Sequence, residues 1–371
     1  MRLHHLTRTL LCASSLLIGG AAVLSGATAI NLHWVDIRAL NVEGRGWTDT
    51  GAFYHRLPAK AAQTVSPVVY NLSKQTAGML VRFISDGTAL HARWSLTSSN
   101  LALPHMSATG VSGLDLYVRE AGRRWRWLGV GMPQAQTNNA RLVFGLEPGE
   151  REFLLYLPLY NGVHSVEIGV PEGCRIEPAG PWGKGQRKPI VFYGTSIQQG
   201  ACASRPGMVH SSILGRRFDW PTINLGFSGS GKMEPVMADL IAELDASLYV
   251  LDCLPNLEEK ELQERLEPFV RRLRQDHPAT PILLVEDRTY ANAHLVLANR
   301  VHQERIRAIT RECYQRLQRE GFRHLHYLEG EHLLGSDDEG TVDSSHPNDL
   351  GFMRQADAFA KVLRPLLRPG R

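Results

Sequence analysis

The second half of the chain contains four short segments whose residues could do covalent chemistry. The candidates stand in "VFYGTSIQQG", "GFSGSG", "DCLPN" and "VDSSHPNDLGF": Ser196, Gly229, Asn256, Asp343 and His346. A serine hydroxyl attacks a carbonyl carbon only when a base removes its proton, which a histidine such as His346 can do. A carboxylate three residues earlier, Asp343, can hold the ring in one tautomer and offset its developing charge. These residue types predict acyl transfer with Ser196 as the nucleophile.

Acyl transfer also needs hydrogen-bond donors that already point at the oxyanion of the tetrahedral intermediate. We expect this oxyanion hole to consist of the backbone N–H of Ser196, the backbone N–H of Gly229 and the side-chain amide of Asn256. Glycine suits position 229 because the backbone must come close to the substrate and can adopt a positive φ there. The same residues also have structural interpretations as turn formers or helix caps, and "SGSG" lacks the lysine and spacing of a phosphate-binding loop.

From residue 190 onward, apolar strand-like runs alternate with amphipathic helical segments. The runs are "IVFYG", "TINLGF", "LYVLDCL", "PILLVED" and "LHYLEG". Such alternation predicts an α/β fold with a parallel sheet covered on both faces, and right-handed crossovers narrow it to a flavodoxin-like, doubly wound, five-stranded sheet. Open sheets of this type bind ligands at the carboxyl ends of their strands. All the candidate residues follow strands or precede the last helix, so we expect them to meet at that edge.

The region before residue 178 has a different pattern. At 371 residues with 43% hydrophobic content, the chain is long enough for two domains. Short and partly alternating runs between turn residues predict an all-β sandwich or jelly roll over residues 30–177. The Gly- and Pro-rich segment 178–189 is the expected linker, and residues 190–371 are the expected hydrolase domain.

The first 29 residues have the plan of a signal peptide. Arg2 and Arg8 precede a mostly apolar stretch, which closes on the small residues "SGATA". A retained membrane anchor is less favoured, because Ser and Gly residues interrupt the apolar stretch. A lipoprotein acylated at Cys12 is also less favoured, because Cys12 follows two leucines. We therefore expect export to the periplasm or the extracellular space. Outside the cytosol the remaining cysteines can form disulfides, with the pairing left open: Cys174, Cys202, Cys253 and Cys313.

Composition gives little sign of other partners. The net charge of +4 is spread along the chain, so we expect no nucleic acid partner, although the cluster at residues 123–127 mixes Arg with Trp. His324 and His326 share one face of a strand but lack carboxylates in register, and no Cys/His spacing suggests zinc. We expect no metal, no organic cofactor and no stable membrane insertion after removal of the leader. The oligomeric state stays open.

The four segments resemble the sequence blocks of the SGNH (GDSL-like) hydrolase superfamily. The resemblance places the family's catalytic Ser, Gly, Asn and His on Ser196, Gly229, Asn256 and His346, and its acid on Asp343. "GTSI" stands where the wider family often has GDS, which is similar to one branch of secreted bacterial members. In that branch a β-sandwich domain with a GxDLY motif precedes the hydrolase, and "GLDLY" at residues 113–117 matches it. The resemblance covers residues 30 to 365.

The resemblance implies a secreted serine esterase for short acyl esters, acetyl esters above all, of carbohydrates or other polyhydroxylated compounds. The alternatives are a lipase- or thioesterase-like hydrolase of longer acyl chains and a carbohydrate-binding protein without turnover. Four residues near the expected site are predicted substrate contacts: Thr195, Gln198, Tyr290 and Asn292. Asp115 and Tyr117 point to one side of a strand, which favours a structural pair at a domain interface over a substrate contact.

Overall fold

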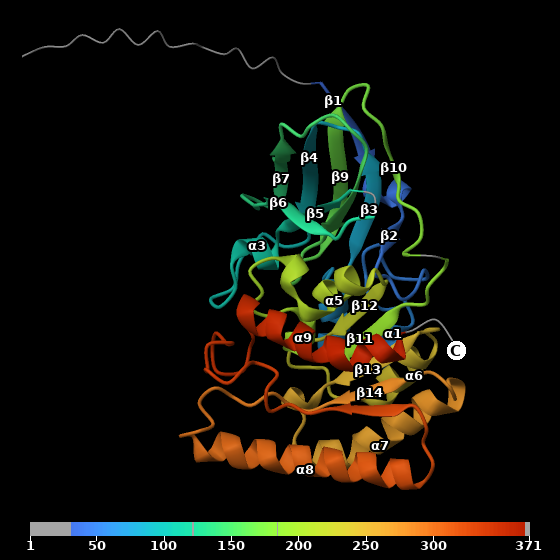
Figure 1. Ribbon diagram of the computed structural model, residues 1–371, viewed down its shortest axis with the longest axis vertical. Helices are drawn as coiled ribbons and strands as arrows, with labels where there is room; N and C mark the ends of the chain where they lie inside the picture. Colours follow the sequence, from blue (N-terminus) through green and yellow to red (C-terminus); the bar gives the residue numbers. More distant parts are fainter. Residues whose placement is uncertain (1–30, 121, 184, 368–371) are drawn as a thin grey trace, which may run out of the picture. The chain divides into compact units, whose positions relative to one another are not determined.

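A computed structural model describes residues 31–120, 122–183 and 185–367. The predicted signal peptide lies outside these residues. From Leu32 onward the chain forms one compact unit, in which two antiparallel sheets precede a parallel sheet (Figure 1). Within the described ranges, no helix is both long and apolar enough to cross a membrane.

The N-terminal region is the predicted β-sandwich. One sheet has four strands in the order β1 (Leu32–Asp36), β9 (Val163–Pro171), β4 (Ala89–Leu96) and β7 (Thr137–Phe144). The other has the order β10 (Ile176–Pro178), β3 (Leu80–Ser85), β8 (Arg151–Tyr156), β5 (Leu114–Arg119) and β6 (Arg126–Gly131), with β2 (Val42–Glu43) beside β3. The inward-facing residues of both sheets form one apolar core, in which Trp94 is buried and Phe83 stacks on Phe153. The sandwich prediction is confirmed.

Short helices lie between the strands of the N-terminal region. η1 (Ile37–Leu40) packs in the sandwich core, whereas α1 (Ala61–Thr64), α2 (Pro67–Ser73) and α3 (Ala108–Val111) pack against the parallel sheet's side of the molecule. Ser66 caps α2 because its side chain accepts a hydrogen bond from the Val69 N–H, and Pro67 occupies the first helical position. Ala61 and Val69 belong to the same apolar core as the parallel sheet. The predicted domains thus share buried surface, and the boundary at residues 178–189 stays a prediction.

The parallel sheet confirms the predicted α/β architecture. Its order is β12 (Thr222–Gly226), β11 (Ile190–Gly194), β13 (Leu248–Asp252), β14 (Ile282–Val285) and β15 (Leu325–Leu328). The strands are mainly apolar because both faces of the sheet are covered. On one face Phe192 and Val250 pack with α5 (His210–Phe218) and α9 (Asp349–Leu366). On the other face, Tyr193 packs with the helices α6 (Pro235–Ala242), α7 (Glu259–Asp276) and α8 (Leu297–Arg319).

Short helical turns follow two of the parallel strands, β11 and β13. α4 (Ser196–Gln199) begins two residues after β11, η2 (Pro206–Met208) precedes α5, and η3 (Leu254–Asn256) follows β13. Figure 1 shows the loop before α9 and the loop before α8 on the same side of the molecule as α3. The carboxyl edge of the sheet is therefore bordered by loops from both halves of the chain.

The "GLDLY" segment on β5 contacts the segment around η2. The Asp115 carboxylate is completely buried and accepts hydrogen bonds from Arg205 Nη1 at 2.9 Å, from the Gly207 N–H at 2.7 Å and from Trp127 Nε1 at 3.0 Å. The Tyr117 hydroxyl contacts the same guanidinium. Both side chains therefore lie on one side of β5 and serve as a structural anchor between the sandwich and the parallel sheet.

Replacing Asp115 by alanine is predicted to lower the free energy of unfolding by about 2–4 kcal/mol, because it leaves the Gly207 N–H and Arg205 without their acceptor. Chemical denaturation followed by intrinsic fluorescence measures the loss. Asp245→Ala is the matched control, since its exposed ion pair with Lys188 should contribute less than about 1 kcal/mol. Equal effects of the two variants would contradict the anchoring role of Asp115.

Candidate active site

A chain of hydrogen bonds joins the serine that follows β11 to the loop before α9. Ser196 Oγ lies 2.8 Å from His346 Nε2, and His346 Nδ1 lies 2.7 Å from Asp343 Oδ2. Ser196 is 8% exposed, so most of its surface is buried. The structure thus brings together three residues that the sequence places up to 150 positions apart.

Local structure holds each member of this chain in place. Thr195 is the N-cap of α4, and Ser196 is the first residue of that helix, directly beyond the end of β11. On the other side, the His346 N–H donates to Asp343 Oδ1 at 2.8 Å, and the Val342 N–H donates to the His346 carbonyl. The loop therefore closes on itself around the carboxylate and presents the imidazole to the serine.

The electrostatics of the pair fix which ring nitrogen carries the proton. Partial burial raises the pKa of the Asp343 carboxyl, but the backbone and side-chain hydrogen bonds from His346 outweigh it, and the pKa lies below its usual value. An ionised carboxylate only accepts hydrogen bonds, so the proton of the neutral ring resides on Nδ1. Nε2 is then free to accept the hydroxyl proton of Ser196.

Two further candidates lie at the ends of the neighbouring strands. Gly229, in the turn after β12, has φ +66°, the left-handed conformation that favours glycine. The turn is closed by the Ser230 and Gly231 N–H groups, which both donate to the Phe227 carbonyl. No hydrogen bond to the Gly229 N–H is found within residues 31–120, 122–183 and 185–367.

The Asn256 side chain has an unused donor. Its Nδ2 atom is buried and has no hydrogen-bond partner in the described part of the chain. A buried donor without a partner is uncommon in proteins and points to a ligand or a water molecule as its partner. Asn256 ends η3 and is not the cap of α7, because Glu258 holds that position. The helix-cap interpretation of Asn256 is therefore wrong.

The four predicted substrate contacts fall into two pairs. Thr195 and Gln198 are fully buried: Thr195 Oγ1 accepts from the Ile197 N–H, and Gln198 Nε2 donates to Ser211 Oγ. Their side chains face the interior, so neither offers a surface to a substrate in this structure. The reason is the tight turn of α4, which directs only its first residue toward His346.

Tyr290 and Asn292 lie instead in the loop between β14 and α8, beside the loop that carries His346. The Asn292 N–H donates to Ser344 Oγ at 3.3 Å, and the Ala291 N–H donates to the Ser344 carbonyl at 3.0 Å. Burial raises the pKa of the Tyr290 hydroxyl, which keeps it protonated. Both residues therefore lie beside the loop that carries His346, and their role as substrate contacts stays a prediction.

Sequence reasoning missed two residues of the N-terminal region that reach the site. The Tyr160 hydroxyl donates to the Ser196 carbonyl at 3.2 Å. The exposed ring of His105, in the loop before α3, has its centroid 6.0 Å from that of His346. Neither contact has a signal in local spacing, because both depend on how the sandwich packs against α4 and the loop before α9.

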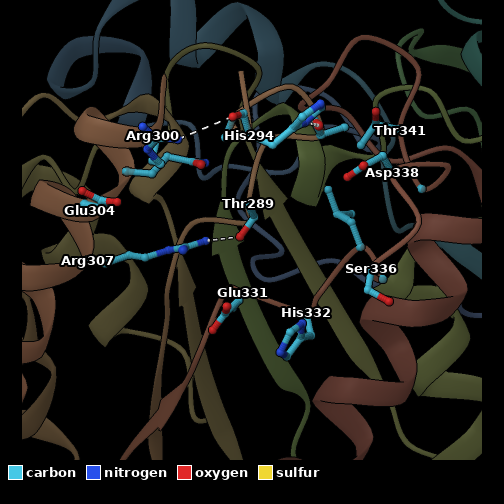
Figure 2. Close-up of a pocket in the computed structure, with 16 residues that line it drawn as sticks. Thr289, His294, Arg300, Glu304, Arg307, Glu331, His332, Ser336, Asp338 and Thr341 are labelled. Carbon is cyan, nitrogen blue, oxygen red and sulfur yellow. Dashed lines mark hydrogen bonds between the residues drawn. The ribbon is translucent and has the colours of Figure 1, made fainter. Parts of the chain in front are cut away.

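A cavity that is separate from the serine–histidine pair lies beside α8. The cavity has a volume of about 370 Å³ and is enclosed by the loops after β14 and β15 and by α8, and its wall includes Thr289, Arg307, Glu331, His332 and Thr341 (Figure 2). Figure 2 shows Arg307 reaching across to Thr289, to which it donates a hydrogen bond at 2.9 Å. None of the residues of the serine–histidine chain lines it.

No group of three or more His, Cys, Asp or Glu side chains in the described part of the chain could hold a metal ion, and His324 and His326 belong to no such cluster. The four cysteines of the described residues are free thiols: Cys174, Cys202, Cys253 and Cys313. The question of disulfide pairing is thereby answered for this structure: none of these thiols is paired.

Comparison with known proteins agrees with this geometry. The model of the GDSL-like lipase/acylhydrolase family matches residues 187–364, and the model of the N-terminal GxDLY domain of SGNH-hydrolase-type esterases matches residues 32–176. No protein of curated function matches the chain.

Solved structures include one near relative and several of the same fold. A Bacteroides ovatus protein described as a GDSL-like lipase is 36% identical, with a TM-score of 0.86 over 91% of this chain and 98% of its own. The salicylyl acyltransferase SsfX3 of a tetracycline biosynthetic pathway is 22% identical, with a TM-score of 0.72 over 92% and 99%. A family two carbohydrate esterase from Cellvibrio japonicus is 14% identical, with a TM-score of 0.57 over 91% and 98%.

The similarity to the acyltransferase and to the carbohydrate esterase shows the fold alone. The similarity to the Bacteroides ovatus protein extends to the sequence. Both family models also fall on the two halves of the chain that the sequence patterns distinguish. The chain belongs to the GDSL-like lipase/acylhydrolase family, as an SGNH-type carboxylic ester hydrolase with an N-terminal GxDLY domain.

Proposed function

We propose that the protein is an exported serine esterase that removes short acyl groups, acetyl above all, from carbohydrates or related polyhydroxylated compounds. The observation that carries the proposal is the hydrogen-bonded chain from Ser196 through His346 to Asp343, together with the buried Asn256 amide nitrogen, which has no partner among the described residues. Export rests on the signal-peptide pattern of residues 1–29.

The first half of the reaction forms an acyl-enzyme. Ser196 Oγ attacks the ester carbonyl carbon while His346 Nε2 takes the hydroxyl proton, and Asp343 offsets the charge of the imidazolium. The carbonyl oxygen becomes an oxyanion, which accepts hydrogen bonds from the N–H groups of Ser196 and Gly229 and from Asn256 Nδ2. The C–O bond to the alcohol then breaks, and His346 returns the proton to the leaving oxygen.

The second half reverses these roles with water. His346 takes a proton from a water molecule, whose oxygen attacks the acyl carbon of the ester on Ser196. The same donors stabilise the second oxyanion. Its collapse breaks the bond to Ser196 Oγ, which recovers its proton from His346, and releases the carboxylic acid. Every proton and bond is accounted for by these groups and water.

Polar side chains around the serine support a short acyl group and a hydroxyl-rich alcohol. The Tyr290 and Asn292 loop, the exposed His105 ring and the serines at positions 344 and 345 border the site. Carbohydrate esterases occur on this fold, among them a family two esterase from Clostridium thermocellum solved with cellohexaose (14% identity, TM-score 0.53). Hydroxyl and imidazole groups are suited to hydrogen bonding with sugar hydroxyls.

One observation favours longer acyl chains as a second candidate. Leu295 and Leu297 are 82% and 59% exposed at the start of α8, three and five residues after Asn292. Exposed apolar side chains beside a site can bind an alkyl chain, since burying them removes apolar area from water. The choice between the two candidates is a choice of acyl length, with the same chemistry at Ser196.

The reaction itself is tested with p-nitrophenyl acetate. Ser196→Ala and His346→Ala should each lose at least about 10³-fold in kcat, because the nucleophile or its base is gone. His164→Ala, which removes an exposed histidine of the sandwich, is the control and should keep the wild-type rate. Release of nitrophenol by wild type at the rate of Ser196→Ala would favour a binding protein without turnover.

Asn256→Ala is predicted to separate activity from stability. The variant should lose about 10²–10³-fold in kcat, as expected for one oxyanion donor. Its free energy of unfolding should change by less than about 1 kcal/mol, since the amide nitrogen has no hydrogen-bond partner among the described residues to lose. Steady-state kinetics and urea denaturation of the same preparations measure both. A stability loss that accounts for the rate loss would contradict the proposed role.

Acyl length is tested with p-nitrophenyl acetate, butyrate and octanoate, followed by acetylated oligosaccharides. We expect kcat/KM to fall by at least about tenfold from acetate to octanoate, because the bordering side chains are polar. The variant Leu295→Ser with Leu297→Ser should leave acetate hydrolysis unchanged. A preference for octanoate that this double variant abolishes would establish the second candidate.

A further inference from the structure

The second glutamine of "GTSIQQG" is the one that reaches the oxyanion turn. Gln199 is fully buried at the end of α4, three residues after Ser196. Its Oε1 atom accepts a hydrogen bond from the Ser228 N–H at 3.0 Å. Ser228 directly precedes Gly229 in the turn after β12. The side chain of the nucleophile's own helix therefore fixes the peptide unit next to the expected oxyanion donor.

Close packing of α4 against the end of β12 explains how so short a helix can reach the turn that contains Ser228. A Cβ atom on Gly226, the last residue of β12, would lie 2.1 Å from the Gln199 backbone nitrogen. Only glycine lets α4 rest directly on the end of that strand. The turn is held on its other side as well, where the Ser230 and Gly231 N–H groups donate to the Phe227 carbonyl. The Gly229 N–H lies between these two fixed points.

The N-terminal region determines which way the Gln199 amide faces. Its Nε2 atom donates to the Leu159 carbonyl at 3.2 Å and to the Gln75 side-chain oxygen. The Leu159 carbonyl can only accept, so a flipped Gln199 amide would set its oxygen against that carbonyl and its nitrogen against the Ser228 N–H, whereas in the observed orientation Gln75 Oε1 accepts a second hydrogen bond from Nε2. Gln75 thus favours the one orientation in which Gln199 can accept from Ser228.

Gln75 is itself anchored to the parallel sheet. The buried guanidinium of Arg56 donates to the Gln75 carbonyl at 2.8 Å and to the Gly226 carbonyl at 2.8 Å. Its carbon lies 4.8 Å from the centre of the Phe227 ring. One arginine of the N-terminal region therefore ties the backbone of Gln75 to the strand end from which the oxyanion turn starts.

We propose that Gln199 is a positioning residue for the oxyanion hole, which aims the Gly229 N–H through Ser228 and is oriented by Gln75 of the N-terminal region. This role rests on the proposed esterase function, because it concerns the oxyanion of that reaction. It assigns the GxDLY domain a part in catalysis that acts through hydrogen bonds to α4 and does not require contact with the substrate.

Methionine variants test the role, because methionine keeps the length of glutamine and makes no comparable hydrogen bond. Gln199→Met should lower kcat for p-nitrophenyl acetate by about 10–100-fold, with KM changed less than about threefold, since oxyanion donors act on the transition state. The Ki of phenylboronic acid, which forms a tetrahedral adduct with a reactive serine, should rise in parallel with the loss in kcat/KM. Gln199→Glu keeps an acceptor for Ser228 and should recover part of kcat.

A double variant tests whether Gln75 acts through Gln199. Gln75→Met should lose about 3–10-fold in kcat, and Gln75→Met with Gln199→Met should be no slower than Gln199→Met alone. Gln318→Met is the control: its Nε2 atom also donates to a backbone carbonyl, that of Leu325 at the opposite edge of the sheet. It should keep the wild-type kcat and Ki.

The outcomes separate this inference from the proposed function. If wild type hydrolyses the ester and Gln199→Met keeps its kcat and Ki, or if the losses of the two single variants multiply, the positioning role is refuted while the esterase stands. If Gln199→Met loses activity only through a higher KM or a lower folded fraction, the role is likewise refuted. If wild type shows no hydrolysis and no boronate binding beyond Ser196→Ala, the proposed function fails and the inference with it.

Discussion

The hydrogen bond between Ser196 and His346 is the interaction on which the proposed chemistry depends. A single such bond contributes about 1 kcal/mol in water-accessible surroundings, so it cannot by itself hold two loops together. The scaffold must hold them. Ser196 is placed by the end of β11, which has a buried strand on each side, and His346 by a loop that closes around Asp343 just before α9. The reactive pair is thus a consequence of sheet order and of where α9 begins.

A buried ion pair beneath the site secures the position of α9. The Arg288 guanidinium, just after β14, bonds to Asp252 at the end of β13, and both side chains are buried. The same guanidinium donates to Gln355 Oε1 on α9. An arginine can serve three elements at once because its planar group carries five donors. The network fixes the helix that follows His346 relative to two strand ends, and so supports the bond to Ser196 without touching it.

The N-terminal sandwich region contributes hydrogen bonds to the surroundings of Ser196. Asp115 of "GLDLY" anchors the segment around η2, Tyr160 contacts the Ser196 carbonyl, and Arg56 and Gln75 reach the end of β12. These contacts come from four separate segments and converge on α4 and its surroundings. A domain that only captured substrate would not need buried hydrogen bonds to the helix of the nucleophile. The arrangement therefore links the integrity of the sandwich to the geometry of the hydrolase site.

The sequence predicts the parallel sheet well because its strands are buried on both faces and read as continuous apolar runs. It also predicts that Ser196, Gly229 and Asn256 follow strands whose carboxyl ends share one edge, and that His346 precedes the last helix. Other features depend on packing that no local pattern records. Strands β1 and β7 contain few buried residues, so no apolar run in the sequence marks them. Gln198 and Gln199 are neighbours with the same chemistry, and only the direction of each side chain on α4 distinguishes a core residue from one that reaches Ser228.

The most direct test of the account is the identification of the residue modified by a fluorophosphonate, a reagent that phosphonylates activated serines. The account predicts a single adduct on the peptide that contains Ser196, formed at least about 10²-fold more slowly in His346→Ala, because the serine then lacks its base. Modification at another residue, or a rate at Ser196 that does not depend on His346, would contradict it.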